Sequence, residues 1–238
     1  MCIRDRYSQL QKSETLDLWF QFYKAYVSSV KEPQPFDEFI KWAPSLLNDF
    51  NAIDRYLVDA RKLFQHIYDA KLLEQWSPGE EPTEFMNNFV RFYADLHVLY
   101  QALHKQMHSE GVAYQGAIVR VLAEKLEESF TGHEQKHPNL IFAGFNALNP
   151  AEEKIVRFFI QQGKAKLFWD VDEYYLKEEQ EAGLFIRKQM QWPEVQGQQS
   201  FVLKAYQQAK TITEYPAPFE YCLLYTSDAA DERSSEDL

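Results

Sequence analysis

Two short apolar runs separated by a strong helix signal constrain the fold more than any other part of this sequence. The runs, Leu140–Ala143 and Lys166–Asp170, have the length and character of buried strands. Between them, Asn149 can cap a helix whose first residue is proline, Glu152 can complete a capping box, and Gly163 suits the helix end. A strand, a helix and a second strand in this order predict a βαβ unit with parallel strands.

The part of the chain before this unit has the periodicity of helices, because apolar residues recur there at spacings of three and four. The sequence therefore predicts an α/β fold that is mostly helical. Two strands are too few for a sheet, so we expect its remaining strands to come from elsewhere in a longer parent protein. The predicted helical stretches are Leu16–Val30, Phe36–Leu47, about Asp49 to Leu73, Thr83 to Gly111 and Ala117–Glu128.

The two ends of the chain differ from its body. Met1–Arg6 and Cys222–Leu238 resemble translated sequencing-adaptor read-through, and no apolar period continues into them. We therefore expect residues 1–6 and 222–238 to be artefacts, and residues 7–221 to be a fragment of a longer protein. The alternative for the C-terminal end is an authentic disordered acidic tail.

Charge and cysteine content limit the function classes. The formal net charge is -11, and the body without its two ends remains acidic, so bulk electrostatics gives no argument for nucleic-acid binding. Both cysteines, Cys2 and Cys222, lie in the ends, which excludes disulfides and thiolate zinc sites from the body and fits a reducing cytoplasm. No run reaches the ~18–20 apolar residues of a membrane span. We expect a cytoplasmic protein without membrane association.

The residues after the first predicted strand resemble a helicase motif that has lost its acids. In superfamily 1 helicases of the UvrD and RecB kind, a strand ends in the pattern D-E-F-Q-D-T-N-P, whose first Asp holds magnesium and whose Glu orients the attacking water. The corresponding run in this chain is Ala143-Gly144-Phe145-Asn146-Ala147-Leu148-Asn149-Pro150. Its Phe, Asn and Pro match in register, whereas Ala143, Gly144 and Ala147 stand at the acidic positions. A methyl group or a hydrogen cannot ligate magnesium, so ATP hydrolysis at this site is chemically implausible.

This pattern resembles the inactivated helicase-like region of AddB-type subunits, which are long bacterial PD-(D/E)XK nuclease proteins. Further segments carry the same resemblance, and together they are more specific than any one alone. The likeness covers most of Tyr7–Pro193. The further segments are Trp42–Leu57, Gly111–Gly116, Phe168–Tyr175 and Glu181–Phe185.

The resemblance implies a helical domain inserted into a RecA-like domain with a parallel sheet. Residues 7–30 would end one RecA-like portion, residues 31–130 would form the insertion, and residues 131–221 would form an incomplete RecA-like α/β portion. The implied function is that of a non-hydrolysing scaffold segment of a helicase–nuclease acting in DNA double-strand break processing and recombinational repair. DNA, bound through the parent protein, and a motor helicase–nuclease subunit are the implied partners.

Two other functions stay open. One is a divergent, active ATP-dependent DNA helicase that uses Asp170 or Glu152 as its acid. The other is a helical protein-interaction module unrelated to DNA.

Two parts of the family's machinery do not occur in the sequence. There is no G-x-x-x-x-G-K-[ST] loop to cradle phosphate. The nuclease carboxylates and the Mg²⁺ that they bind are expected in a later domain of the parent. Glu152-Glu153-Lys154 resembles half of the nuclease motif, but it opens a helix where the motif needs a strand. We expect no catalytic residue, no metal site and no cofactor in this stretch, and whether the chain belongs to an enzyme stays open.

A few acidic residues after the second predicted strand are weak site candidates. Asp170, Asp172 and Glu173 lie where α/β proteins often place metal or nucleotide ligands. Asp170 and Asp172 would point to opposite faces of a continued strand, which disfavours a shared ion. We favour a solvated strand end.

Histidines and basic residues give no sharper site. His104 and His108 have the i, i+4 spacing that suits one zinc ion, but no third ligand is evident, and we expect both to face solvent. Basic residues are scattered among acids, and the sequence does not single out those that would contact DNA. They are Arg55, Arg61, Lys62, Lys71, Arg91, Lys105, Arg120 and Lys125.

Overall fold

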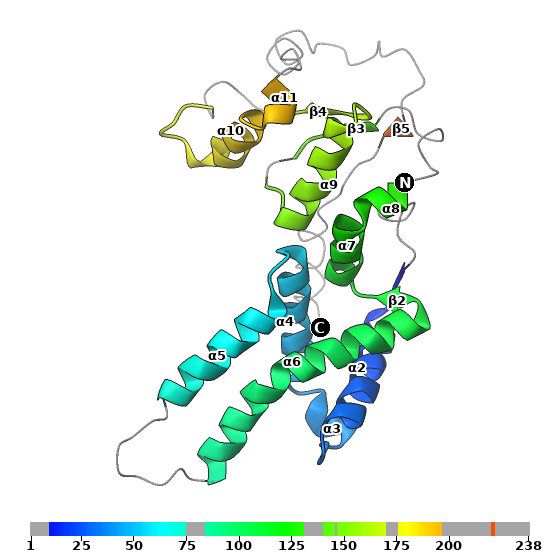
Figure 1. Cartoon of the computed structure of the whole chain (residues 1–238), viewed down its shortest axis with the longest axis vertical. Coiled ribbons are helices and arrows are strands. Elements are labelled where there is room, and N and C mark those ends of the chain that lie inside the picture. The colour runs from blue at the N-terminus through cyan, green and yellow to red at the C-terminus, as the bar shows by residue number, and fades with distance from the viewer. Residues whose placement is uncertain are drawn as a thin grey trace, which may run out of the picture. The chain divides into compact units, whose positions relative to one another are not determined.

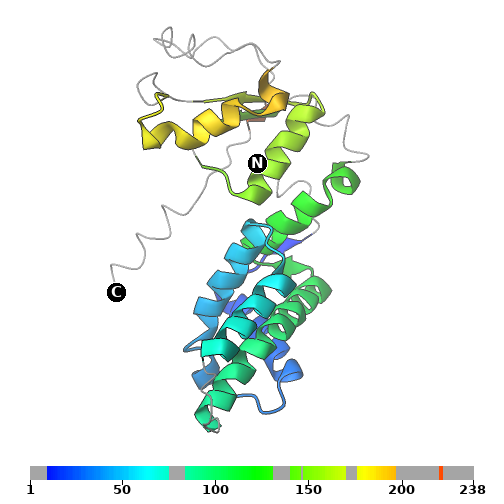
Figure 2. The same cartoon turned by 60° about the vertical axis from the view of Figure 1, so that its left-hand side comes forward.

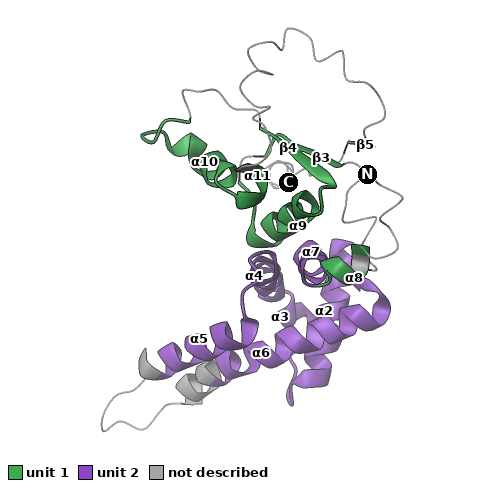
Figure 3. Cartoon of the chain, turned by 45° about the horizontal axis from the view of Figure 1, so that its top comes forward, with its two compact units in different colours: residues 1–7, 125–238 green, residues 8–124 purple. Residues whose placement is uncertain are grey.

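The computed structural model describes residues 10–74, 84–130, 140–145, 147–169, 176–196 and 220–221. This part of the chain is mostly helical, and it also contains two small parallel sheets (Figures 1 and 2). The chain divides into a helical unit, Ser8–Glu124, and an α/β unit, Lys125–Leu238 together with Met1–Tyr7 (Figure 3). Among the described residues, no helix is long and apolar enough to cross a membrane.

The helical unit is built around its longest helix, α6, which packs against both α2 and α5 (Figure 2). Helix α4 packs against α7, and strands β1 and β2 form a short parallel pair. The elements are β1 (Gln11–Lys12), α2 (Thr15–Ser29), α3 (Phe36–Phe39), α4 (Ala43–Arg55), α5 (Ala60–Glu74), α6 (Glu84–Glu110), β2 (Val112–Ala113) and α7 (Gln115–Glu124).

An aromatic core holds the helical unit together. Phe22, Phe39 and Phe50 are fully enclosed, and the Phe22 ring lies 5.1 Å from Phe39 and 5.9 Å from Phe50 between centroids. Helix α6 contributes Tyr100 and Leu103, because its apolar residues keep the helical spacing. The periodicity that predicted helices over Leu16–Val30 and from Thr83 to Gly111 is confirmed by α2 and α6.

The prediction of one helix from about Asp49 to Leu73 is wrong, because the structure divides that stretch into α4 and α5. Leu57 has a φ of 53°, a left-handed conformation that ends α4. The amide of Leu57 donates to the carbonyl of Asp54 at 3.1 Å, and the amide of Val58 donates to that of Ile53 at 3.0 Å. These two bonds form a Schellman motif, in which glycine is the usual left-handed residue. Because this position is a leucine, the sequence lacks the glycine that would have predicted the end of α4.

The α/β unit contains a three-stranded parallel sheet in the order β4-β3-β5. Strands β3 and β4 pair in register from Leu140 with Ala165 to Ala143 with Phe168. The elements are α8 (Leu126–Phe130), β3 (Leu140–Ala143), α9 (Pro150–Gln161), β4 (Ala165–Phe168), a 3₁₀ turn η1 (Glu181–Gly183), α10 (Leu184–Met190), α11 (Pro193–Gln196) and β5 (Glu220–Tyr221).

The predicted βαβ unit is confirmed by β3, α9 and β4. Helix α9 begins at Pro150 after the Asn149 cap, and its apolar side buries Val156 and Phe159. Gly163, with a φ of 66°, follows the helix end as the sequence indicated.

The compact units have bounds of their own, and the domain boundaries implied by the resemblance stay a prediction. Helix α2, which lies within residues 7–30, packs along α6 in the helical unit. The helical unit ends at Glu124, and α8 belongs to the α/β unit. Phe130 of α8 contacts Phe159 of α9, with 5.4 Å between their ring centroids.

Candidate functional site

The turn between β3 and α9 is the site that the sequence singled out. Ala143 is the last residue of β3, and Gly144 follows with a φ of 75°. The amide of Gly144 donates to the carbonyl of Phe168 at 3.3 Å, which continues the pairing of β3 with β4 by one residue. Phe145 turns into the interior and is 5% exposed. The backbone at the second acidic position of the motif is therefore left-handed, a conformation that favours glycine.

The N-terminus of α9 is capped by the side chains of Asn149 and Glu152. The amide of Glu152 donates to Oδ1 of Asn149 at 3.0 Å, and the amide of Asn149 donates to Oε2 of Glu152 at 3.1 Å. This reciprocal pair is the capping box that the sequence predicted. Glu152 is 6% exposed, so its carboxylate is used inside the cap and does not face a ligand.

The residues of this turn do not fit a magnesium ion. Ala143 and Ala147 offer only methyl groups, Gly144 has no side chain, and the nearby Glu152 carboxylate already accepts a hydrogen bond from the cap. Magnesium requires oxygen ligands in a near-octahedral arrangement. We therefore derive no metal-dependent step at this turn. Asn146 lies outside the described residues.

The other acidic candidates give no site within the described part of the chain. Asp170, Asp172 and Glu173 lie outside the described residues. Among the residues that are described, no group of three or more His, Cys, Asp or Glu side chains is arranged to hold a metal ion.

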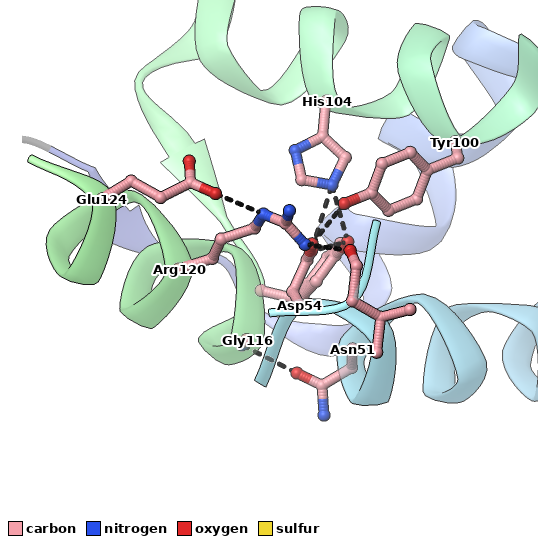
Figure 4. A network of polar contacts seen from close by, with 9 residues as sticks. Asn51, Asp54, Tyr100, His104, Gly116, Arg120 and Glu124 are labelled. Atoms are coloured by element: carbon pink, nitrogen blue, oxygen red, sulfur yellow. Dashed lines mark hydrogen bonds and ion pairs between the residues drawn. The ribbon is translucent and has the colours of Figure 1, made fainter. Parts of the chain in front are cut away.

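A buried carboxylate in the helical unit was missed by the sequence reasoning. Asp54, near the end of α4, has none of its surface exposed and lies among side chains from α6 and α7 and from the residue between β2 and α7 (Figure 4). Its Oδ1 accepts a hydrogen bond from the Tyr100 hydroxyl, and its Oδ2 accepts one from the Tyr114 hydroxyl. Nε2 of His104 lies 3.0 Å from Oδ2, and Nη1 of Arg120 lies 3.4 Å from Oδ1.

Arg120 connects this carboxylate to the end of α4 and to the surface. Its Nη1 donates to the carbonyl of Val58 at 2.9 Å, and its Nε donates to Oε1 of Glu124 at 2.9 Å (Figure 4). The Val58 carbonyl belongs to the residue that completes the Schellman motif. Arg120 therefore binds the same turn whose backbone ends α4.

The two tyrosines remain hydrogen-bond donors over a wide pH range. Burial, together with the hydrogen bond to Asp54 and the charge of that carboxylate, raises the pKa of Tyr100 well above its usual value. Burial and the charge of Asp54 raise the pKa of Tyr114 in the same direction. Both phenols therefore stay protonated and can satisfy the buried carboxylate.

His104 does not lie where the sequence reasoning placed it. We expected His104 and His108 to face solvent together, but the His104 side chain is only 26% exposed and contacts Asp54, whereas His108 is exposed. Nε2 of His104 also lies 3.0 Å from the Tyr114 hydroxyl. One signal was present in the sequence. Asp54 falls four residues after Phe50, at the spacing of the buried side of α4.

A close backbone approach completes the junction of α4 and α7. The amide of Gly116 donates to Oδ1 of Asn51 at 2.7 Å, and a Cβ at Gly116 would lie 2.4 Å from the backbone oxygen of Asn51. Only glycine fits at this position. Asn51 and Asp54 lie in the segment Trp42–Leu57, and Gly116 lies in Gly111–Gly116, so two segments that carry the family resemblance meet at this junction.

The Asp54 cluster has a structural role. Four side chains with donor groups surround the carboxylate, and none of its surface is exposed, so no substrate atom can reach it. The cluster joins α4, α6 and α7. A buried carboxylate with several donors is stable in this way, whereas an unpaired one is strongly unfavourable.

Comparison of the chain with models of known protein families, with curated proteins and with solved structures gave no match. The residues of the β3–α9 turn are therefore the part of the molecule that bears most directly on function.

Proposed function

We propose that this chain is a non-hydrolysing, helicase-like scaffold segment of a helicase–nuclease that processes DNA double-strand breaks in recombinational repair. The observation that carries the proposal is the β3–α9 turn. It keeps the strand, the turn and the Asn-Pro helix start of a motor ATPase, and it has Ala143, Gly144 and Ala147 at the positions of the acids. In this proposal β3, α9 and β4 are part of a RecA-like sheet.

The divergent, active helicase is disfavoured by the position of Glu152. An acid that polarises water must face the nucleotide, and the Glu152 carboxylate instead accepts the Asn149 amide within the cap. Asp170, the other acid considered for that role, lies outside the described residues, so it is included in the test below.

The proposed role in DNA binding is positional. With a net charge of -11 the chain cannot attract DNA by its overall field. A few basic side chains would instead contact phosphates and fix the path of the strand, while the motor partner subunit supplies the force.

The test is to measure ATP hydrolysis by the full chain and DNA binding by the parent protein. We expect no Mg²⁺-dependent hydrolysis above the protein-free rate, with or without DNA. Substitution of Glu152→Gln, which preserves the cap, and of Asp170→Asn should leave this result unchanged. Hydrolysis that Asp170→Asn abolishes would establish the divergent helicase instead.

DNA binding is the second arm of the test. We expect fluorescence anisotropy to show binding of single- or double-stranded DNA that weakens as salt rises, since phosphate contacts release counterions. Lack of binding by the parent protein at the lowest ionic strength would reject the scaffold role.

One observation favours a protein-interaction module as the second candidate function. Helix α2 exposes Leu16, Phe20 and Val27 along one side, which is a surface suited to another protein chain. Absence of DNA binding together with a stable protein contact on this side would favour the module.

A further inference from the structure

Helix α2 has a second apolar side that the helical unit does not cover. Its inner side buries Phe22 and Tyr26, whereas Leu16, Phe20 and Val27 are 56%, 46% and 43% exposed. These three residues lie at i, i+4 and i+11, so they follow one line along the helix. We call Leu16, Phe20 and Val27 the outer stripe.

The outer stripe has a fixed flat surface at its centre. The ring of Phe20 stacks on the ring of Phe36, with 5.2 Å between centroids and 8° between planes. Phe36 begins α3 and is half-buried. Phe20 is therefore held in one orientation before any partner arrives, which lowers the entropy lost on binding.

Two opposite charges border the outer stripe two helical turns apart. Asp17 and Lys24 are both exposed and lie on the same border of the stripe. Neither has an opposite charge three or four residues away in α2, the spacings at which side chains of a helix form ion pairs. Each charge is thus available to a group outside the helix.

We propose that the outer stripe binds the same stripe of a second copy of this chain, with the two α2 helices antiparallel across a two-fold axis. In such an interface residue i contacts residue j and residue j contacts residue i. With the axis beside Phe20 and Gln21, Asp17 of each copy faces Lys24 of the other, because the same border of both helices meets. The ion pair forms twice, and the two Phe20 rings meet at the centre.

The size of the stripe sets the strength of this dimer. A stable interface buries about 800 Å² on each partner, and the three side chains of the outer stripe supply less than that. We therefore expect a weak dimer. Its ion pairs are exposed, so salt weakens it further.

The first experiment is analytical ultracentrifugation of the full chain over a wide concentration range. We expect a monomer–dimer equilibrium whose dissociation constant rises several-fold between low and high salt. Substitution of Val27→Glu should raise that constant by about tenfold or more. The matched control is Val98→Glu on α6, where the valine is 46% exposed, and this change should leave the constant unaltered.

The second experiment exchanges the two charges. Asp17→Lys alone and Lys24→Asp alone each place like charges together twice, so each should weaken the dimer several-fold at low salt. The double substitution restores opposite charges and should return the constant to within about twofold of the original. Circular dichroism checks that each variant is folded.

A chain that is monomeric at all concentrations would overturn the proposal. So would association that continues beyond a dimer, or single-charge effects that the double substitution does not reverse, because either would mean that the contact is not the two-fold antiparallel one.

Discussion

At the scale of single residues, the Asp54 carboxylate shows how a charge can be placed in a core. Removing a carboxylate from water is unfavourable by several kcal/mol even after relaxation of the protein. Hydrogen bonds from Tyr100 and Tyr114 and the nearby cations of Arg120 and, when protonated, His104 offset that penalty. The arrangement is therefore sensitive to the loss of any one member.

We expect Asp54→Asn to destabilise the chain by about 3–5 kcal/mol, because the amide nitrogen would face donors that need an acceptor. Chemical denaturation monitored by circular dichroism measures the change in unfolding free energy. The control is Asp49→Asn on the same helix, where the side chain is exposed, and this variant should differ from the parent by less than about 0.5 kcal/mol. Equal effects of the two substitutions would contradict a structural role for the cluster.

The same cluster predicts a loss of stability in alkali. The pKa of Tyr100 and that of Tyr114 are raised in the folded chain, mainly by burial, so the neutral phenols are favoured there. Their contribution to the unfolding free energy is complete below about pH 10, the pKa of tyrosine in the unfolded chain. As the pH rises above that value, each tyrosine loses up to about 1.4 kcal/mol of this contribution per pH unit.

Denaturation at a series of pH values tests this. Tyr100→Phe and Tyr114→Phe should each reduce the slope of stability against pH above 10. An unchanged slope in both variants would show that other groups cause the alkaline loss.

At the scale of elements, the turn between α4 and α5 is strained by its own sequence. Leu57 takes the left-handed conformation that a Schellman motif needs, which is unfavourable by about 1–2 kcal/mol for a residue with a side chain. Leu57→Gly should therefore stabilise the chain by up to about 1 kcal/mol, after the loss of a half-buried side chain is subtracted.

Thermal denaturation distinguishes this effect from a general glycine effect. Tyr56→Gly, one residue earlier and with a φ of -89°, should destabilise the chain instead. If both glycines lower the melting temperature alike, the left-handed strain is not significant.

The elements that the sequence predicted well share one property, which is that a local signal is sufficient to define them. The apolar period of α2 and α6, the capping box of α9 and the short apolar runs of β3 and β4 each act within a few residues. The break at Leu57 was missed because its glycine signal is absent. Asp54 was missed for a different reason: a lone acid on a helix is usually exposed, and only tertiary contact with α6 and α7 reveals its partners.

At the scale of the whole molecule, each of the two compact units has its own core. Phe22 and Phe50 lie in the helical unit, whereas Phe142 and Phe159 lie in the α/β unit. Units with separate cores can unfold separately.

We therefore expect Phe22→Ala to lower the melting temperature of one calorimetric transition and Phe159→Ala to lower that of another. Each substitution leaves a cavity in one unit only, and it should reduce the unfolding free energy of that unit by about 3–5 kcal/mol. The expressed segment 8–124 should also unfold cooperatively when isolated. A single transition that both substitutions shift equally would show that the two units fold as one.

The left-handed backbone at Gly144 has an evolutionary consequence. A mutation that places a glutamate there would be unfavourable by about 1–2 kcal/mol, because a residue with a side chain is strained in the left-handed conformation. Under the proposed function, an acidic site at this turn would also require an acid at Ala143. If the chain has the proposed helicase-like origin, a single substitution at this turn therefore does not produce an acidic site, and the backbone itself favours keeping the glycine.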